Sequence, residues 1–242
     1  MLHATCATVA WKEVLTLELT MPTRGSALAD QAYIVLRDAI LSHQLPPGTR
    51  LSVPEMARRL GISRSPAREA IARIAQEGLA RVEHGRGALV ADIQRDDLLE
   101  IYALREVLEG LACRLAASLV SADDIVALRA LMDEHQAAIE RGDTERHYEL
   151  DQSFHATIRG LAANQRLAES LDRLQGQIRV AMFTTRRSPG GMPLALAEHR
   201  LIVEALATSD PYSAEDAGRA HISRLLSDLK QSVDQSEEIS SA

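Results

Sequence analysis

The chain has 242 residues, of which 46% are hydrophobic and 3% are aromatic, and its formal net charge at pH 7 is −7. This length suits two domains with a sizeable core, and no apolar run reaches the roughly 18 residues that a membrane-spanning helix needs. The acidic balance excludes a protein that coats nucleic acid over its whole surface, while two widely spaced cysteines fit a reducing, cytoplasmic setting.

The charge is unevenly distributed along the chain. Residues 28–92 hold nine arginines and seven acidic residues, a net charge of +2, whereas residues 93–242 hold sixteen basic and twenty-five acidic residues, a net charge of −9. The pattern predicts a weakly basic N-terminal module joined to an acidic C-terminal module. The start of the chain lacks a basic n-region, so we expect no secretory signal peptide.

The first predicted elements lead to a short helical module. Residues 1–26 show no clean period and are predicted to be an N-terminal extension, with a candidate strand at 14–19. Apolar residues at helical spacing predict a helix over residues 27–44, which the sequence "LPPG" ends.

Two further helices and a hairpin complete this module. Ser52 can cap a helix that ends at Gly61, and Ser63 can cap a second helix that runs to about Glu77. Two helices joined by a short turn that contains glycine form a helix-turn-helix. The alternation around His84–Gly87 predicts a β-hairpin, so residues 27–92 are expected to form a winged helix-turn-helix domain.

The remainder of the chain is predicted to be helical throughout. Breaks near Ser121, Gly142, Asn164, Pro193 and Pro211 predict about six helices: 96–119, 123–140, 144–162, 165–185, 193–207 and 211–232. Leucine and alanine dominate these segments, as in a helical bundle. The fold class is therefore mainly α, with an antiparallel bundle over residues 96–232 and a frayed polar tail over residues 233–242.

The second helix of the predicted helix-turn-helix begins with polar and basic residues. This end of a recognition helix enters the major groove, where arginine can donate two hydrogen bonds to guanine and a serine hydroxyl can contact phosphate. The predicted wing adds an arginine between glycines, where the backbone can approach DNA closely. The candidate DNA-binding residues are Ser63, Arg64, Ser65, Pro66, Arg68, His84, Gly85 and Arg86.

Four residues of the predicted bundle form a candidate metal site. Asp151 and His155 lie four residues apart on one helix face, and His199 and His221 lie on two later helices. A single histidine on an amphipathic helix is usually a surface or satisfied residue, which is our interpretation of His3, His43, His135 and His147, although His147 lies close to the candidate site. One carboxylate and three imidazoles together can bind a divalent metal and leave coordination positions open.

The residues from "PPGTRLSVPEMARRLGISRSPAREAIARIAQEGLARVEHGRGALV" closely resemble the DNA-binding domain of GntR-type bacterial transcription regulators. The resemblance implies that Arg64 and Arg68 read base edges, while Ser63, Ser65 and the wing contact phosphates or the minor groove. It also implies a homodimer on a palindromic operator.

The segments "DQSFHATI", "AEHRLIVEALATSD" and "RAHISRLL" resemble the FCD ligand-sensing domain of the FadR branch, in its shorter six-helix variant. The resemblance implies that the Asp-x3-His pair and two later histidines bind zinc, with nickel or manganese as alternatives, and that the metal helps to hold a small carboxylate effector. Arg105 is then a candidate carboxylate clamp, with an ion pair to Glu109 as the equal alternative. Asn164, which can instead cap a helix, and Arg146 are further candidates for effector binding.

Three functions remain open at this point. The first is a ligand-responsive transcription regulator, expected to be a repressor, in the bacterial cytoplasm and on the nucleoid when it binds DNA. The second is the same regulator with a purely structural metal and no small effector. The third is a metal-dependent hydrolase joined to a DNA-binding module, which is disfavoured because no general base or nucleophile motif accompanies the candidate ligands.

Overall fold

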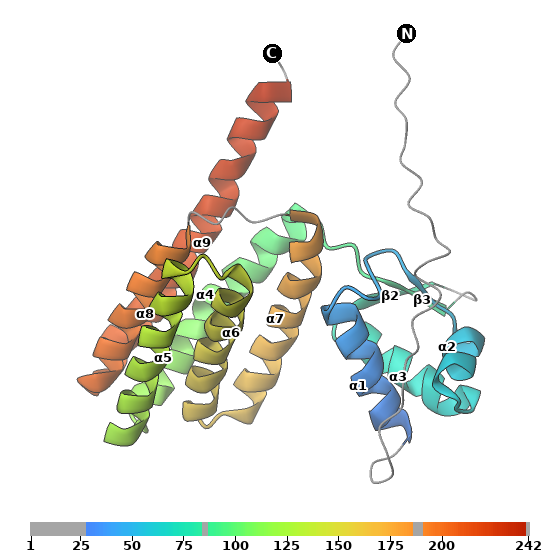
Figure 1. The fold of residues 1–242 in the computed structure, drawn as a ribbon, viewed down its shortest axis with the longest axis horizontal. Coiled ribbons are helices and arrows are strands. Elements are labelled where there is room, and N and C mark those ends of the chain that lie inside the picture. The colour runs from blue at the N-terminus through green and yellow to red at the C-terminus, as the bar shows by residue number, and fades with distance from the viewer. Residues whose placement is uncertain (1–27, 84–86, 186–190, 241–242) are drawn as a thin grey trace. The chain divides into compact units, whose positions relative to one another are not determined.

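A computed structural model describes the backbone of residues 28–83, 87–185 and 191–240, and the side chains of residues 28–83, 87–181 and 191–231 (Figure 1). The chain forms two compact units. The first consists of described residues up to Ile93 together with Gly176–Thr185, and the second consists of Gln94–Gln175 together with described residues from Gly191 onward. The candidate strand at 14–19 lies outside the described residues.

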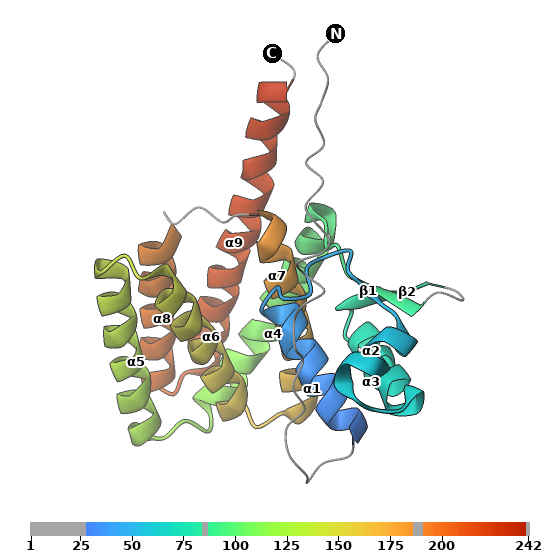
Figure 2. The same cartoon turned by 45° about the vertical axis from the view of Figure 1, so that its right-hand side comes forward.

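The first unit contains three helices and a small sheet, which confirms the predicted winged helix-turn-helix (Figure 2). The antiparallel sheet has the strand order β1-β3-β2, and Arg81 of β2 lies opposite Leu89 of β3. The short strand β1 was not predicted, because two residues carry no alternation that a pattern can reveal. The elements are α1 (Leu28–Leu41), β1 (Arg50–Leu51), α2 (Val53–Leu60), α3 (Arg64–Gln76), β2 (Ala80–Glu83) and β3 (Gly87–Val90).

Two glycines fix the turns of this unit. Gly61 has a φ of 65° and ends α2 in the left-handed conformation that glycine adopts without a steric penalty. Gly87 has a φ of 93°, and a Cβ atom at this position would lie 2.7 Å from the carbonyl oxygen of Leu51. Ser52 and Ser63 occupy the predicted N-cap positions, but neither side chain makes a capping hydrogen bond.

Six helices of the described chain build the bundle of the second unit, as the sequence predicts, although Gly176–Thr185, the C-terminal part of the fourth of these helices, belongs to the first unit. Helix α9 continues to Ser240, whereas a frayed tail was expected after residue 232. No glycine or proline follows Gly218, so nothing in the sequence forces the helix to end earlier. The helices are α4 (Arg95–Ala117), α5 (Ala122–Glu140), α6 (Thr144–Leu161), α7 (Gln165–Thr185), α8 (Met192–Ala207) and α9 (Pro211–Ser240).

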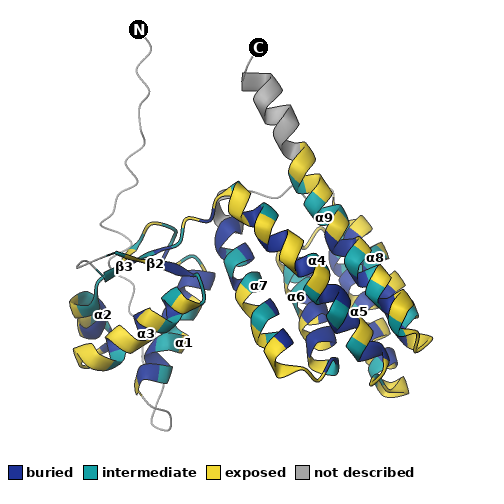
Figure 3. Cartoon of the chain, turned by 180° about the vertical axis from the view of Figure 1, so that it is seen from behind, coloured by how far each residue is buried: buried dark blue, intermediate teal, exposed yellow. Residues whose placement is uncertain are grey.

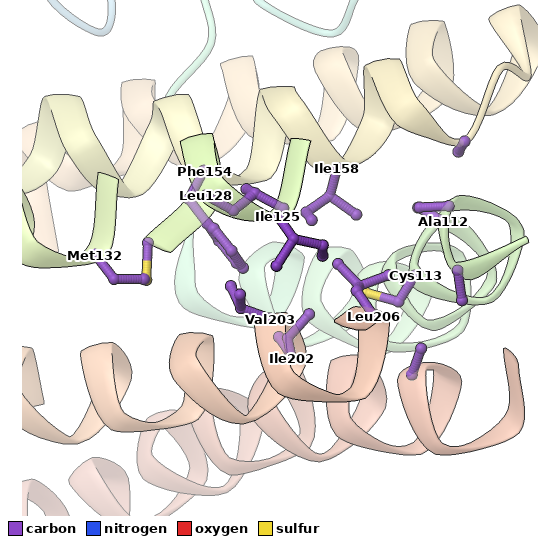
Figure 4. Close-up of a cluster of buried hydrophobic side chains, with 14 of the residues drawn as sticks. Ala112, Cys113, Ile125, Leu128, Met132, Phe154, Ile158, Ile202, Val203 and Leu206 are labelled. Carbon is purple, nitrogen blue, oxygen red and sulfur yellow. The ribbon is translucent and has the colours of Figure 1, made fainter. Parts of the chain in front are cut away.

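The core of the bundle is aliphatic. Helix α4 packs along α9, α8 contacts both α5 and α9, and α6 contacts α4 and α5. Buried residues line the inward faces of these helices and exposed residues line the outward faces (Figure 3). Figure 4 shows Phe154 of α6 beside Leu128 of α5, with Val203 and Leu206 of α8 in the same cluster. The cluster gives the polar residues of α6, α8 and α9 a rigid frame.

Candidate functional sites: a nucleic-acid interface and a metal centre

Helix α3 presents its polar N-terminal end to solvent. Ser63, Arg64, Ser65 and Arg68 are exposed, and Pro66 is half-buried. The opposite face of the helix packs into the unit through its buried residues Ala67, Ala70, Ile71 and Ile74. The apolar spacing of α3 therefore fixes which side of the helix faces solvent.

The two arginines at this end differ from Arg58 and Arg73 of the same unit, which have acidic partners. Arg58 donates to Glu55 at 2.7 Å, and Arg73 donates to Asp30 at 2.5 Å. Arg64 and Arg68 make no hydrogen bond or ion pair with another described residue. Their guanidinium groups are thus available for base edges or phosphates, with the bidentate geometry that guanine recognition requires. The predicted wing residues His84, Gly85 and Arg86 lie outside the described residues, between β2 and β3.

The structure brings the four candidate metal ligands together in the bundle. Asp151 and His155 lie on α6, His199 on α8 and His221 on α9, and all three histidines are buried. Nε2 of His199 lies 3.3 Å from Nε2 of His221 and 3.8 Å from Oδ1 of Asp151. One ring nitrogen from each histidine lies within 4.8 Å of the others. Two nitrogen ligands of a tetrahedral zinc ion lie about 3.3 Å apart, so the spacing suits such an ion.

Two of these histidines are oriented by glutamates, of which Glu109 is buried and Glu198 is half-buried. Nδ1 of His221 lies 2.8 Å from Oε2 of Glu198, which also accepts a hydrogen bond from Arg224 at 2.8 Å. Nδ1 of His155 lies 3.5 Å from Oε2 of Glu109. A carboxylate behind an imidazole fixes the ring and its tautomer, and leaves Nε2 as the atom that can bind a metal. Sequence reasoning did not assign either glutamate this role.

The electrostatics of the site lower the pKa values of two imidazoles and of the carboxylate. Burial, reinforced by the charges of neighbouring histidines, lowers the pKa of His199 well below its ordinary value. Burial also lowers the pKa of His221. For Asp151, burial acts to raise the pKa, but the positive charge that His155 and His221 carry when protonated, together with His147 and Arg105, outweighs it and holds the pKa below its ordinary value. Neutral imidazoles and an ionised carboxylate are the forms that bind a divalent cation.

Two further histidines lie beside this group. Nε2 of His135 lies 2.6 Å from Nδ1 of His147, and both residues are buried. The ring centre of His135 lies 6.0 Å from that of His199. Burial and the charge of His147 lower the pKa of His135 to about 4. The sequence interpretation treated both as ordinary histidines, although it noted that His147, four residues before Asp151, lies close to the candidate site.

The structure places the three candidate effector-binding residues differently. Arg105 is buried and donates to Oε1 of Glu109 at 2.9 Å. Oδ1 of Asn164 accepts a hydrogen bond from the backbone N–H of Leu167 at 3.1 Å, which is the capping role. Arg146 is exposed and pairs with Glu134 and Glu149 on the surface. Of the three, Arg105 alone is buried with partners that also contact a candidate metal ligand.

The architecture of the two units corresponds to known protein families. Residues 28–90 match the family of bacterial regulatory proteins called gntR, and residues 100–224 match the FCD domain. A winged helix-turn-helix followed by a helical FCD domain defines a class of DNA-binding transcription regulators. The chain belongs to the gntR family of bacterial regulatory proteins, among the members that carry an FCD domain.

Several relatives share this organisation. The HTH-type transcriptional repressor RspR of Escherichia coli K12 is 27% identical over 201 residues, which cover 83% of this chain and 88% of RspR. A probable D-xylose utilization operon transcriptional repressor of Paenarthrobacter nicotinovorans is 31% identical over 212 residues, covering 86% and 89% of the two chains. The solved structure of E. coli McbR/YncC has a TM-score of 0.70 at 23% identity, covers 86% of this chain and 99% of its own, and shows the shared fold.

These relatives are transcription regulators, which confirms the expectation that the chain is not an enzyme. No helix within the described residues is long and apolar enough to span a bilayer.

Proposed function

We propose that this regulator is a metal-dependent repressor that responds to a small organic acid. In this proposal Asp151, His155, His199 and His221 hold a divalent cation, with zinc as the first expectation and nickel or manganese as alternatives. The bound cation would supply a Lewis-acidic contact for an effector carboxylate. Effector binding would change the affinity of the winged domains for a palindromic operator, with a coupling free energy of about 1–3 kcal/mol.

The observation that carries the proposal is the group of three buried imidazoles beside the carboxylate of Asp151. Burying several polar rings in an aliphatic core is costly unless each finds a partner. Glu198 is the partner of Nδ1 of His221 at 2.8 Å, and Glu109 lies 3.5 Å from Nδ1 of His155. The Nε2 atoms of His199 and His221 face each other at 3.3 Å, and two ring nitrogens without a proton cannot form a hydrogen bond. A cation at this position would satisfy them together.

A homodimer is the assembly that the proposal requires. Two recognition helices are needed to read two half-sites of a palindrome. The solvent face of α4 exposes two large apolar residues one turn apart, Leu104 at 57% and Val107 at 52%. Such a strip favours burial against a second copy, and light scattering of the purified chain measures the mass directly.

The metal site is tested by substituting two ligands together. His199→Ala with His221→Ala is expected to remove the bound metal, measured by elemental analysis of protein prepared without chelator. Far-ultraviolet circular dichroism verifies that the bundle remains helical. An unchanged metal content in the folded double variant would contradict the assignment.

The DNA interface is tested with operators selected from a random duplex pool by the wild-type protein. Arg64→Ala with Arg68→Ala is expected to abolish the preference for selected over scrambled duplex, because each bidentate arginine contributes about 1–3 kcal/mol of discrimination. Arg129→Ala is the matched control, since Arg129 is an exposed arginine of the bundle that pairs with Glu204. A double variant that keeps its preference would refute the recognition-helix assignment.

One observation favours the alternative of a purely structural metal. Four protein ligands complete a tetrahedral zinc site, and closed sites of this kind are typically structural. Arg105 is already paired with Glu109, as the alternative interpretation of that residue expects. The two functions differ in one measurable respect, because a structural metal stabilises the fold without making the protein respond to carboxylates.

A further inference from the structure

A second group of buried charges lies behind His155, on the side of its ring that faces Glu109. Glu109 accepts a hydrogen bond from Arg105 at 2.9 Å, and Nη1 of Arg159 lies 3.6 Å from the same carboxylate oxygen. The exposed fractions of the side chains are 3% for Glu109, 4% for Arg105 and 6% for Arg159. Two guanidinium groups therefore share one buried carboxylate.

Charge around this group is not balanced within the core. Nε of Arg159 pairs with Asp172 at 3.1 Å, but the side chain of Asp172 is 59% exposed, so water screens this pair. The negative charge of Asp151 contributes to raising the pKa of Arg105, but its Oδ1 lies 3.8 Å from Nε2 of His199, and the carboxylate belongs to the candidate metal site. The other close neighbour of Glu109 is His155, whose Nδ1 lies 3.5 Å from Oε2 of the carboxylate. Glu109 is thus the one fully buried carboxylate between two fully buried cations among the described residues.

Each guanidinium group also retains a buried donor without an acceptor. Among the described residues, Nε of Arg105 and Nη1 of Arg159 have no hydrogen-bond partner. A buried charged donor without an acceptor costs more free energy than a buried neutral donor without one. Both atoms belong to groups that already converge on Glu109, so each guanidinium group can take a further acceptor in this part of the core.

We infer that Arg105 and Arg159 form a two-guanidinium subsite for a carboxylate of the effector, which Glu109 occupies in its absence. The inference rests on the proposed function and adds Arg159 to the effector-binding residues. It also specifies the class of effector: a small dicarboxylate, with one carboxylate for the four-ligand cluster and one for the arginine pair. The carboxylate of Glu109 occupies the position between the two arginines at which an effector carboxylate would bind, so the two carboxylates compete for Arg105 and Arg159.

Competition by Glu109 and structural support by Glu109 predict opposite changes in dicarboxylate affinity when this residue is substituted. Glu109→Gln removes the negative charge that neutralises both arginines, so dicarboxylate affinity should increase. If Glu109 were only a structural support for Arg105 and His155, the same substitution would loosen the site and weaken binding. Arg159→Met, which removes one of the two cations, should weaken dicarboxylate binding.

The experiment is a calorimetric titration of the metal-loaded full chain with succinate and with butyrate, which has the same number of carbons and one carboxylate. We expect wild type to bind succinate more tightly than butyrate. Arg159→Met should weaken succinate binding about tenfold and leave butyrate binding unchanged, and Glu109→Gln should tighten succinate binding about tenfold. Elemental analysis verifies equal metal loading, and Arg129→Met is the control for loss of an exposed arginine.

Two results would overturn the inference: succinate affinity unchanged in Arg159→Met, or weakened in fully loaded Glu109→Gln. Failure of the proposed function has a different signature, since the chelated protein would then bind succinate as well as the loaded protein does, with the same response to Arg159→Met. If wild type binds neither acid, Glu109→Gln still decides, because absence of succinate binding in that variant contradicts a subsite that Glu109 occupies.

Discussion

Glu198→Gln tests whether the carboxylate behind His221 supports metal binding. Nδ1 of His221 lies 2.8 Å from Glu198, and the side chain of Glu198 is only 17% exposed. Glutamine can still accept a hydrogen bond, but it lacks the negative charge that raises the basicity of the imidazole and that pairs with Arg224. Loss of such a partner lowers metal affinity about 10- to 100-fold, which corresponds to about 1.4–2.7 kcal/mol.

The assay is a competition titration of zinc between the protein and a chromophoric chelator. Glu204→Gln is the matched control, because Glu204 lies on the same helix and its side chain, 62% exposed, pairs with Arg129 at 3.0 Å. The control should bind zinc as wild type does. If Glu198→Gln also retains wild-type affinity, the reasoning that His221 is a ligand oriented by Glu198 is wrong.

Three further predictions concern stability, measured by denaturant or thermal unfolding of metal-free protein. Leu206→Ala should cost about 2–5 kcal/mol because Leu206 is fully buried, whereas Leu201→Ala, at a residue 65% exposed on the same helix, should cost less than about 0.5 kcal/mol. Gly61→Ala should destabilise by about 1 kcal/mol because its φ is positive, while Gly160→Ala in α6, where a Cβ meets open space, should stabilise by about 0.5 kcal/mol. Burial lowers the pKa of His199, so the unfolded chain binds more protons below about pH 6.5, and stability should fall as pH decreases through that value. Three results would contradict these arguments: equal losses of stability in the two leucine variants, a Gly61→Ala variant more stable than wild type, or a stability that does not change as the pH decreases below about 6.5.

The sequence predicted most of the fold because its signals are local. Apolar spacing and turn residues placed the six bundle helices within two residues of their observed starts, and Gly61 and Gly87 lie at the turns that require positive φ. The end of α9 was predicted too early, since a polar composition was interpreted as fraying although no helix-breaking residue occurs there.

The candidate site was predictable only in part. The helical spacing of Asp151 and His155 marks a shared face, and the family resemblance indicated His199 and His221. Nothing local reveals that Glu109 reaches His155 or that Glu198 reaches His221, because helix packing alone joins residues that are 46 and 23 positions apart. The contact between Arg159 and Glu109 could not be predicted either, because the two residues lie on different helices.

Thermal unfolding of the full chain against a panel of small carboxylates, with zinc and with chelator, tests the central claim most directly. A ligand that binds the folded state alone stabilises it by about 2.7 kcal/mol at a hundredfold excess over its Kd. The account predicts that chelation lowers the midpoint and that at least one acid raises it in the zinc-loaded protein alone. A midpoint that chelation leaves unchanged, or that no acid raises in the presence of zinc, would contradict a metal-dependent sensor of organic acids.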